Sequence, residues 1–134
     1  MKKRITMICV AAVLAMVLLP GARYTEDRDT VLLARAIYAL ARSESYETKL
    51  AIGTVAMNRV ANAWFADTLG GVLNEQHQFP IGNRYDAESL AAAHAVLSGK
   101  RALSADALHY QSLASAQPLD GAPLATVGGY AFYR

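Results

Sequence analysis

The carboxylates that could supply acid–base chemistry after residue 30 are few and scattered along the chain: Glu44, Glu47, Asp67, Glu75, Asp86, Glu88, Asp106 and Asp120. A carboxyl group that protonates a leaving oxygen needs a partly apolar pocket, which raises its pKa. Asp86 is best explained as a helix cap, and Glu88 as an acid in the first turn of the same helix. Each of the others, taken alone, is typical of a solvated surface charge. The carboxylates by themselves therefore do not identify a reaction.

Several other chemistries are disfavoured by the composition. His77, His94 and His109 share no metal-ligand spacing, and Cys9 is the only cysteine, so we predict no metal and no cofactor. The chain has no glycine-rich phosphate loop between a strand and a helix, and no Gly-x-Ser-x-Gly elbow. The net charge of +2 comes from three basic residues at positions 2–4, while residues 23–134 carry one more acid than base. The charge therefore gives no reason to expect nucleic acid as a partner.

The N-terminus has the parts of a secretory signal. Three basic residues precede an uncharged apolar run over residues 5–19, and Pro20-Gly21-Ala22 follows. We predict that residues 1–22 are a signal peptide or, if uncleaved, a membrane anchor, although residues 5–19 are short for a span of roughly 20. Either form exports the rest of the chain to the periplasm or the cell envelope. The alternative is a buried N-terminal helix in a cytosolic protein.

The elements that would position a site follow from periodicity and caps. Residues 23–30 are polar and predicted to be a linker before a domain over residues 31–134. Asp29 or Thr30 would cap the first helix, and Ser45 the second, which is apolar on most sides and therefore central. Trp64 and Phe65 would close that second helix as core residues. The predicted elements are helices over residues 31–42, 45–61, 67–76 and 86–98, a loop over 79–84, and strands over 107–112, 124–127 and 130–134.

The last two strands flank Gly128-Gly129, which is a two-residue hairpin signal. The fold class predicted from these elements is α+β, mainly helical, with a small antiparallel β-sheet near the C-terminus.

Five stretches of the sequence carry a resemblance to a known family. Residues 31–44 have the sequence Val-Leu-Leu-Ala-Arg-Ala-Ile-Tyr-Ala-Leu-Ala-Arg-Ser-Glu, and residues 57–60 are Met-Asn-Arg-Val. Gln-Phe at 78–79, Ala-Leu-His-Tyr at 107–110 and Gly-Gly-Tyr-Ala-Phe-Tyr-Arg at 128–134 follow in order. Together they resemble the SleB/CwlJ cell wall hydrolase family, which includes the spore cortex-lytic enzymes and related envelope and phage proteins.

This resemblance implies a lysozyme-superfamily-like fold and cleavage of the glycan strands of peptidoglycan, of the lytic transglycosylase or muramidase type. Members use one glutamic acid and no carboxylate nucleophile, unlike the two-carboxylate arrangement of most glycosidases. The acid protonates the glycosidic oxygen, and a hydroxyl of the sugar closes onto the developing positive charge. The implied partner is therefore the glycan strand, with the membrane involved only through residues 5–19.

The chain departs from the family pattern at the position of this acid. The third residue of the family's Tyr-Ala-Glu-Ala sequence aligns with Leu40, which has no proton to donate. The chain is either a member whose catalysis is lost, an inactivated version of an active parent, or a protein in which Glu44 has taken over the acid role. Whether it is an enzyme therefore stays open, and the alternative is a peptidoglycan-binding or structural component of an envelope or phage. We expect Leu40 to lie on a cleft shared with Gln78 and His109.

The resemblance and the loop positions suggest a set of residues for the sugar. Asn58 would bond an N-acetyl group or cap its helix, Tyr38 would line the groove or pack, and His109 and Tyr110 would stack on sugars or pack in the sheet. Gln78 and Phe79 lie in a loop before a proline, where binding residues commonly occur. The predicted substrate-binding residues are thus Tyr38, Asn58, Gln78, Phe79, His109 and Tyr110.

Overall fold

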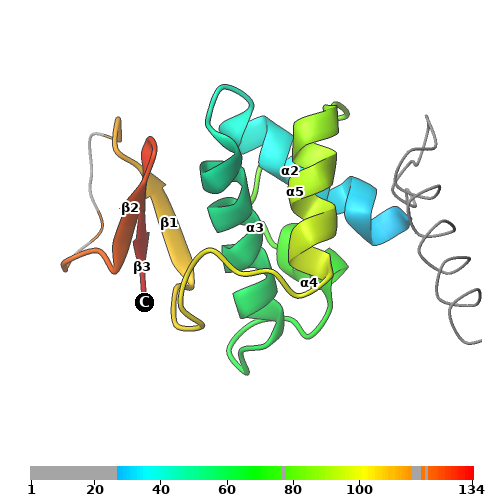
Figure 1. Ribbon diagram of the computed structural model, residues 1–134. Helices are drawn as coiled ribbons and strands as arrows, with labels where there is room; N and C mark the ends of the chain where they lie inside the picture. Colours follow the sequence, from blue (N-terminus) through cyan, green and yellow to red (C-terminus); the bar gives the residue numbers. More distant parts are fainter. Residues whose placement is uncertain (1–26, 77, 116–118, 120) are drawn as a thin grey trace, which may run out of the picture.

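The computed structural model describes residues 27–76, 78–115, 119 and 121–134. The predicted signal or anchor over residues 1–22, residues 23–26 of the predicted linker, and Asp120 lie outside these ranges. The described elements are α2 (Arg28–Ala41), α3 (Tyr46–Val60), α4 (Leu69–Leu73), α5 (Ala87–Leu97), β1 (His109–Ser112), β2 (Ala125–Val127) and β3 (Tyr130–Tyr133). They confirm the predicted α+β class, with helices on one side and a small sheet on the other (Figure 1). Among the described residues, no helix combines the length and the apolar character that crossing a membrane requires.

The N-terminal cap of α2 differs from the prediction. The side chain of Asp27, rather than Asp29 or Thr30, caps the helix, because its carboxylate accepts a hydrogen bond of 2.7 Å from the Thr30 backbone N–H. Residues 28–30, predicted as linker, therefore form the first helical turn, where Asp29 favours the helix dipole. Ser45 caps α3 and Asp86 caps α5 as predicted, each by accepting from the backbone N–H three residues later.

The helix α3 is the central one, as predicted from its apolar surface. Leu50, Ile52 and Val55 on this helix are fully buried. Gly53 lets its neighbours come close, since a Cβ there would lie 3.1 Å from Val96 of α5 and 3.3 Å from Ile37 of α2. The three long helices therefore pack around one small residue in the middle of α3.

The sheet has the strand order β1-β3-β2, with both pairings antiparallel. Tyr110 of β1 pairs with Phe132 of the middle strand, whose side chain is fully buried. The turn between β2 and β3 contains Gly128 at φ 54°, which fits the predicted hairpin. Figure 1 shows the sheet beside α3, so the two parts of the fold meet along that helix.

Of the two aromatic residues after α3, Trp64 lies on the surface and Phe65 packs against the core. Trp64 was predicted to be a core residue, and this is wrong, because its side chain is 91% exposed. Its backbone N–H donates to the Asn62 side chain two residues earlier, an Asx turn that directs the chain outward. Phe65 instead packs against the core, with the Arg59 guanidinium 4.9 Å from its ring centroid.

Asn58 fastens the segment between α5 and β1 to α3. Its side chain is 6% exposed, and its amide donates to the backbone carbonyls of Ser104 at 2.9 Å and Ala107 at 3.0 Å. It does not cap the end of α3. The amide group therefore sets the start of β1.

We expect Asn58→Leu to lower the free energy of unfolding by about 1–3 kcal/mol, because the buried Ala107 carbonyl loses the Asn58 donor while the side-chain volume is nearly kept. The Ser104 carbonyl keeps its hydrogen bond from the Ala107 backbone N–H. Urea denaturation of the full chain measures this difference. A variant as stable as the native chain would contradict the structural role of Asn58.

Candidate functional site

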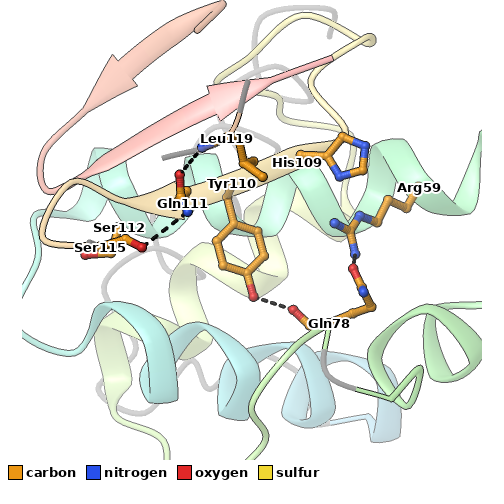
Figure 2. A pocket seen from close by; sticks show the side chains of 8 residues that line it. All are labelled: Arg59, Gln78, His109, Tyr110, Gln111, Ser112, Ser115 and Leu119. Carbon is orange, nitrogen blue, oxygen red and sulfur yellow. Dashed lines mark hydrogen bonds between the residues drawn. The ribbon is translucent and has the colours of Figure 1, made fainter. Parts of the chain in front are cut away.

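A cavity of about 510 Å³ lies along β1, between the sheet and the helices. It brings together residues from three parts of the chain, namely α3, the loop after α4, and β1 with the residues that follow it. Figure 2 shows the lining side chains: Arg59, Gln78, His109, Tyr110, Gln111, Ser112, Ser115 and Leu119. A second cavity, of about 600 Å³, lies along α2 and includes none of the predicted site residues.

Arg59 is the most unusual of the lining residues, because its side chain is only 2% exposed. Its Nε donates to the Leu108 carbonyl at 2.7 Å, and its Nη1 donates to the Gln78 side-chain oxygen at 3.1 Å. The guanidinium also lies over the rings of Phe65 and Phe79, at 4.9 and 5.1 Å from their centroids. One side chain of α3 thus holds the loop after α4 and the residue before β1.

Burial lowers the pKa of the Arg59 guanidinium, while Tyr110 and Glu75 act in the opposite direction. An arginine stays protonated in proteins all the same, so the wall of the cavity carries a fixed positive charge. Sequence reasoning did not select Arg59. The signal was present, because an arginine within a helix that is apolar on most sides has to be buried.

Tyr110 closes the floor of the cavity. Its hydroxyl donates to the Gln78 backbone carbonyl, and its ring lies 5.2 Å from that of Phe79 and 6.1 Å from that of Tyr130. Burial raises the pKa of Tyr110 to about 12, in spite of the opposing charge of Arg59. The phenol is therefore neutral at physiological pH and acts as a hydrogen-bond donor.

His109 lies at the start of β1, with its ring 6.2 Å from that of Phe65. Burial lowers the pKa of this imidazole below its ordinary value of 6.5, and the charge of Arg59 lowers it further. His109 is therefore neutral at pH 7. It offers the cavity one N–H donor and one nitrogen acceptor.

The structure brings together only some of the predicted substrate-binding residues. Gln78, His109 and Tyr110 line one cavity, whereas Asn58 lies beneath the segment before β1. Phe79 was predicted to lie in the groove, but its side chain is 7% exposed and belongs to the core. Tyr38 is partly exposed on α2 and lines neither of the two cavities.

Leu40 does not line the cavity that contains Gln78 and His109. Its side chain is partly buried and packs against the hydrophobic core near the end of α2. Its backbone carbonyl accepts a hydrogen bond of 2.7 Å from the Tyr130 hydroxyl, which ties α2 to β3. Position 40 therefore lies where the helices meet the sheet, and its leucine side chain has no exchangeable proton.

Glu44 lies in the turn between α2 and α3 and reaches the β2–β3 hairpin. Its Oε2 accepts from the Gly129 backbone N–H at 3.2 Å, and the Gly129 carbonyl accepts from Leu113 just after β1. A Cβ at Gly128 would collide with this carboxylate and with the Thr48 hydroxyl, and a Cβ at Gly129 would collide with the carboxylate too. The two glycines thus make room for Glu44 at the far end of β1 from Arg59.

The Glu44 carboxylate also acts on its neighbour Tyr130. Burial raises the pKa of the Tyr130 hydroxyl, and the negative charge of Glu44 raises it further. No group of three or more His, Cys, Asp or Glu side chains that could hold a metal ion occurs in the described part of the chain. The cavity has the Arg59 cation at one end of β1, and the Glu44 carboxylate lies near the other end of this strand without lining the cavity.

Comparison with known families gives a match over most of the described chain. The family model described as Cell Wall Hydrolase matches residues 43–133. This range includes Glu44 and every residue that lines the cavity along β1. It begins three residues after Leu40, so the assignment of position 40 depends on the resemblance of residues 31–44.

Similar proteins include two spore cortex-lytic enzymes. That of Bacillus subtilis (strain 168) is 35% identical over 89 residues, covering 63% of this chain and 29% of the relative. That of Oceanobacillus iheyensis is 43% identical over 53 residues, covering 40% of this chain and 19% of the relative. The chain thus spans less than a third of the length of these relatives.

Two solved structures have the same fold. The catalytic domain of the Bacillus cereus SleB protein has a TM-score of 0.72 at 24% identity, covering 86% of this chain and all of that domain. The catalytic domain of the germination-specific lytic transglycosylase SleB from Bacillus anthracis has a TM-score of 0.73 at 23% identity, covering 87% and 100%. These likenesses show that the chain has the fold of these catalytic domains.

We expect Gly128→Ala to destabilise the chain more than Gly99→Ala. Both glycines have a positive φ, which costs a residue with a Cβ about 1–3 kcal/mol. Only at Gly128 does the new methyl group also meet other atoms, those of Glu44 and Thr48, because nothing lies within 4 Å at Gly99. Urea denaturation of the two variants measures the difference, and equal losses would show that Glu44 does not pack against the hairpin.

We expect His109 to make the stability depend on pH. Because the pKa of His109 is lower in the folded state than its ordinary 6.5, the unfolded chain takes up the proton first as the pH falls. This contribution is absent well above 6.5 and destabilises the fold as the pH falls through 6.5 toward the folded pKa. Thermal unfolding from pH 8 to pH 5 should show a smaller decline for His109→Asn than for the native chain, and parallel declines would contradict the shift.

Proposed function

The chain belongs to the Cell Wall Hydrolase family, and we propose that it is an exported protein that binds the glycan strands of peptidoglycan without cleaving them. The substrate class follows from the family description and from the spore cortex-lytic relatives. Export is required because peptidoglycan lies outside the cytoplasmic membrane, and residues 1–22 have the pattern of a secretory signal. This segment is either removed or retained as an anchor.

The proposal that the chain does not cleave glycan strands rests on the leucine at position 40. A glycosidic bond breaks when an acid protonates the leaving oxygen, and a positioned acid contributes about 10²–10⁴-fold to such a step. In the family pattern that acid aligns with position 40, where this chain has a side chain without a proton to give. The scaffold around it is intact, since Tyr130 still holds the last turn of α2 through the Leu40 carbonyl.

The cavity along β1 supports the binding part of the proposal. Sugars with hydroxyl and acetamido groups need several hydrogen-bonding partners in a concave site. The neutral imidazole of His109, the amide of Gln78 and the hydroxyl of Ser112 face one cavity of about 510 Å³. Because Arg59 and Tyr110 fix its walls, these groups lie in place before a ligand arrives.

Glu44 supports a second candidate function, which is cleavage by a relocated acid. Its carboxylate is partly buried and lies in a fixed place, against the Gly129 N–H. In the proposed function this contact is structural, since it joins the α2–α3 turn to the β2–β3 hairpin. In the second candidate the same carboxyl group would protonate the glycosidic oxygen.

We expect the native chain to sediment with purified cell walls and to release no soluble muropeptide. Leu40→Glu should then create cleavage, with 1,6-anhydro ends among the products, because it places a carboxyl group at the family's acid position. Leu40→Gln is the matched control, since it has nearly the same shape without an acidic proton. Chromatography and mass spectrometry of the released muropeptides make the comparison.

Three results would count against this assignment. Failure of the native chain to sediment with cell walls would contradict the binding function. Cleavage by the native chain that Glu44→Gln abolishes would favour the second candidate. No product from a folded Leu40→Glu variant that still binds cell walls would contradict the role of position 40.

A further inference from the structure

The two buried cations of the described chain differ in their partners. Lys49 is 3% exposed, and its ammonium pairs with the Glu88 carboxylate at 2.7 Å. Arg59 is equally buried, yet among the described residues no carboxylate lies within ion-pair distance of it. The acid that acts on it electrostatically, Glu75, is exposed and forms no ion pair with it. A buried charge is costly unless it is paired, so Arg59 lacks the partner that such a group requires.

The free side of the guanidinium is the side on the cavity. Nε and Nη1 are used by the Leu108 carbonyl and the Gln78 side chain, whereas Nη2 donates to no atom of the described chain. Figure 2 shows the guanidinium at the cavity edge, beside His109 and Gln78. Arginine binds carboxylates through parallel N–H groups of this planar fork, so an unused nitrogen beside an open cavity is a suitable donor.

The remaining lining groups are compatible with an anion. The described residues that line the cavity include no aspartate or glutamate. Ser112 contributes a hydroxyl, and His109, which is neutral at pH 7, contributes a hydrogen-bonding nitrogen. The volume of about 510 Å³ is within the range that holds a small ligand such as one acidic sugar.

We propose that this cavity is a carboxylate-binding subsite in which Arg59 pairs with a carboxylate of the peptidoglycan strand. The source of the ligand rests on the proposed function. Peptidoglycan offers carboxylates of two kinds, the lactyl group of muramic acid where no peptide is attached, and the acidic groups of the stem peptides. Arg59 supplies the charge, and the neutral groups around it orient the ligand.

The first test uses N-acetylmuramic acid as the probe and N-acetylglucosamine, which lacks the lactyl carboxylate, as the matched ligand. Titration of the full chain, followed by the NMR signal of the Arg59 Nε–H, should show N-acetylmuramic acid binding about tenfold or more tightly. The Arg35 Nε–H is the internal control. It also donates to a backbone carbonyl, that of Gly82, but it lies at the other cavity. Equal affinity for the two sugars, or no binding of either, would overturn the subsite.

The second test changes the charge of the cavity without removing Arg59, whose loss would unfold the site. The Ser112 hydroxyl accepts from the Ala114 backbone N–H, a role that aspartate and asparagine oxygens also fill. Ser112→Asp should weaken N-acetylmuramic acid binding about tenfold or more beyond Ser112→Asn, because both variants lose the hydroxyl but only the aspartate adds a negative charge that repels the ligand. Equal affinities for the two variants, when both unfold at the native temperature, would overturn the proposal.

The source of the carboxylate is distinguished with two forms of the glycan strand. Strands whose peptides have been removed by an amidase expose lactyl carboxylates, whereas untreated strands carry the stem-peptide acids. If the native chain binds one form more tightly and Ser112→Asp abolishes this preference, the result supports the subsite and identifies the source of the carboxylate. Binding of both forms that is insensitive to Ser112→Asp overturns the subsite and leaves the proposed function standing. Binding of neither form contradicts the proposed function, and the monosaccharide titration then decides on the subsite alone.

Discussion

The buried guanidinium of Arg59 is the interaction on which the arrangement of the site depends. It joins α3 to the Leu108 carbonyl at the start of the sheet and to the Gln78 side chain after α4, and it packs between the rings of Phe65 and Phe79. Tyr110 adds two further contacts between the loop after α4 and β1, since its hydroxyl donates to the Gln78 carbonyl and its ring lies 5.2 Å from that of Phe79. Arg59 also lines the cavity, so the side chain that holds these segments together contributes a charge to the site.

A second set of contacts holds the opposite end of the sheet. The Glu44 carboxylate meets the Gly129 N–H, and the Tyr130 hydroxyl meets the Leu40 carbonyl. The sheet is therefore fastened to the helices at both ends of β1, and the cavity lies along the strand between them. The Tyr130 contact is made with a backbone carbonyl, which every residue provides. A change of the side chain at position 40 therefore leaves this hydrogen bond in place.

Local interactions could be predicted from the sequence, and long-range ones could not. The caps at Ser45 and Asp86 and the hairpin at Gly128 depend on residues within four positions, so their sequence signals are sufficient. Whether Trp64 or Phe65 is buried depends on which of the two adjacent rings packs against Arg59. This contact is not determined by the neighbouring residues in the sequence. For the same reason Gln78 and His109 were found by family resemblance and loop position, whereas Arg59 was missed although its burial in an apolar helix was a usable signal.

The charges of the described cavity residues support the proposed binding function. A glycan-cleaving acid must exchange a proton with its substrate, and the groups that line the cavity are poorly suited to this step at neutral pH. Tyr110 keeps its proton because its pKa is about 12, Arg59 stays charged, and the lowered pKa of His109 leaves the imidazole without a proton to donate as an acid. What remains is a fixed positive charge among neutral hydrogen-bonding groups. In the proposed subsite, this positive charge would stabilise a carboxylate that the ligand carries both free and bound.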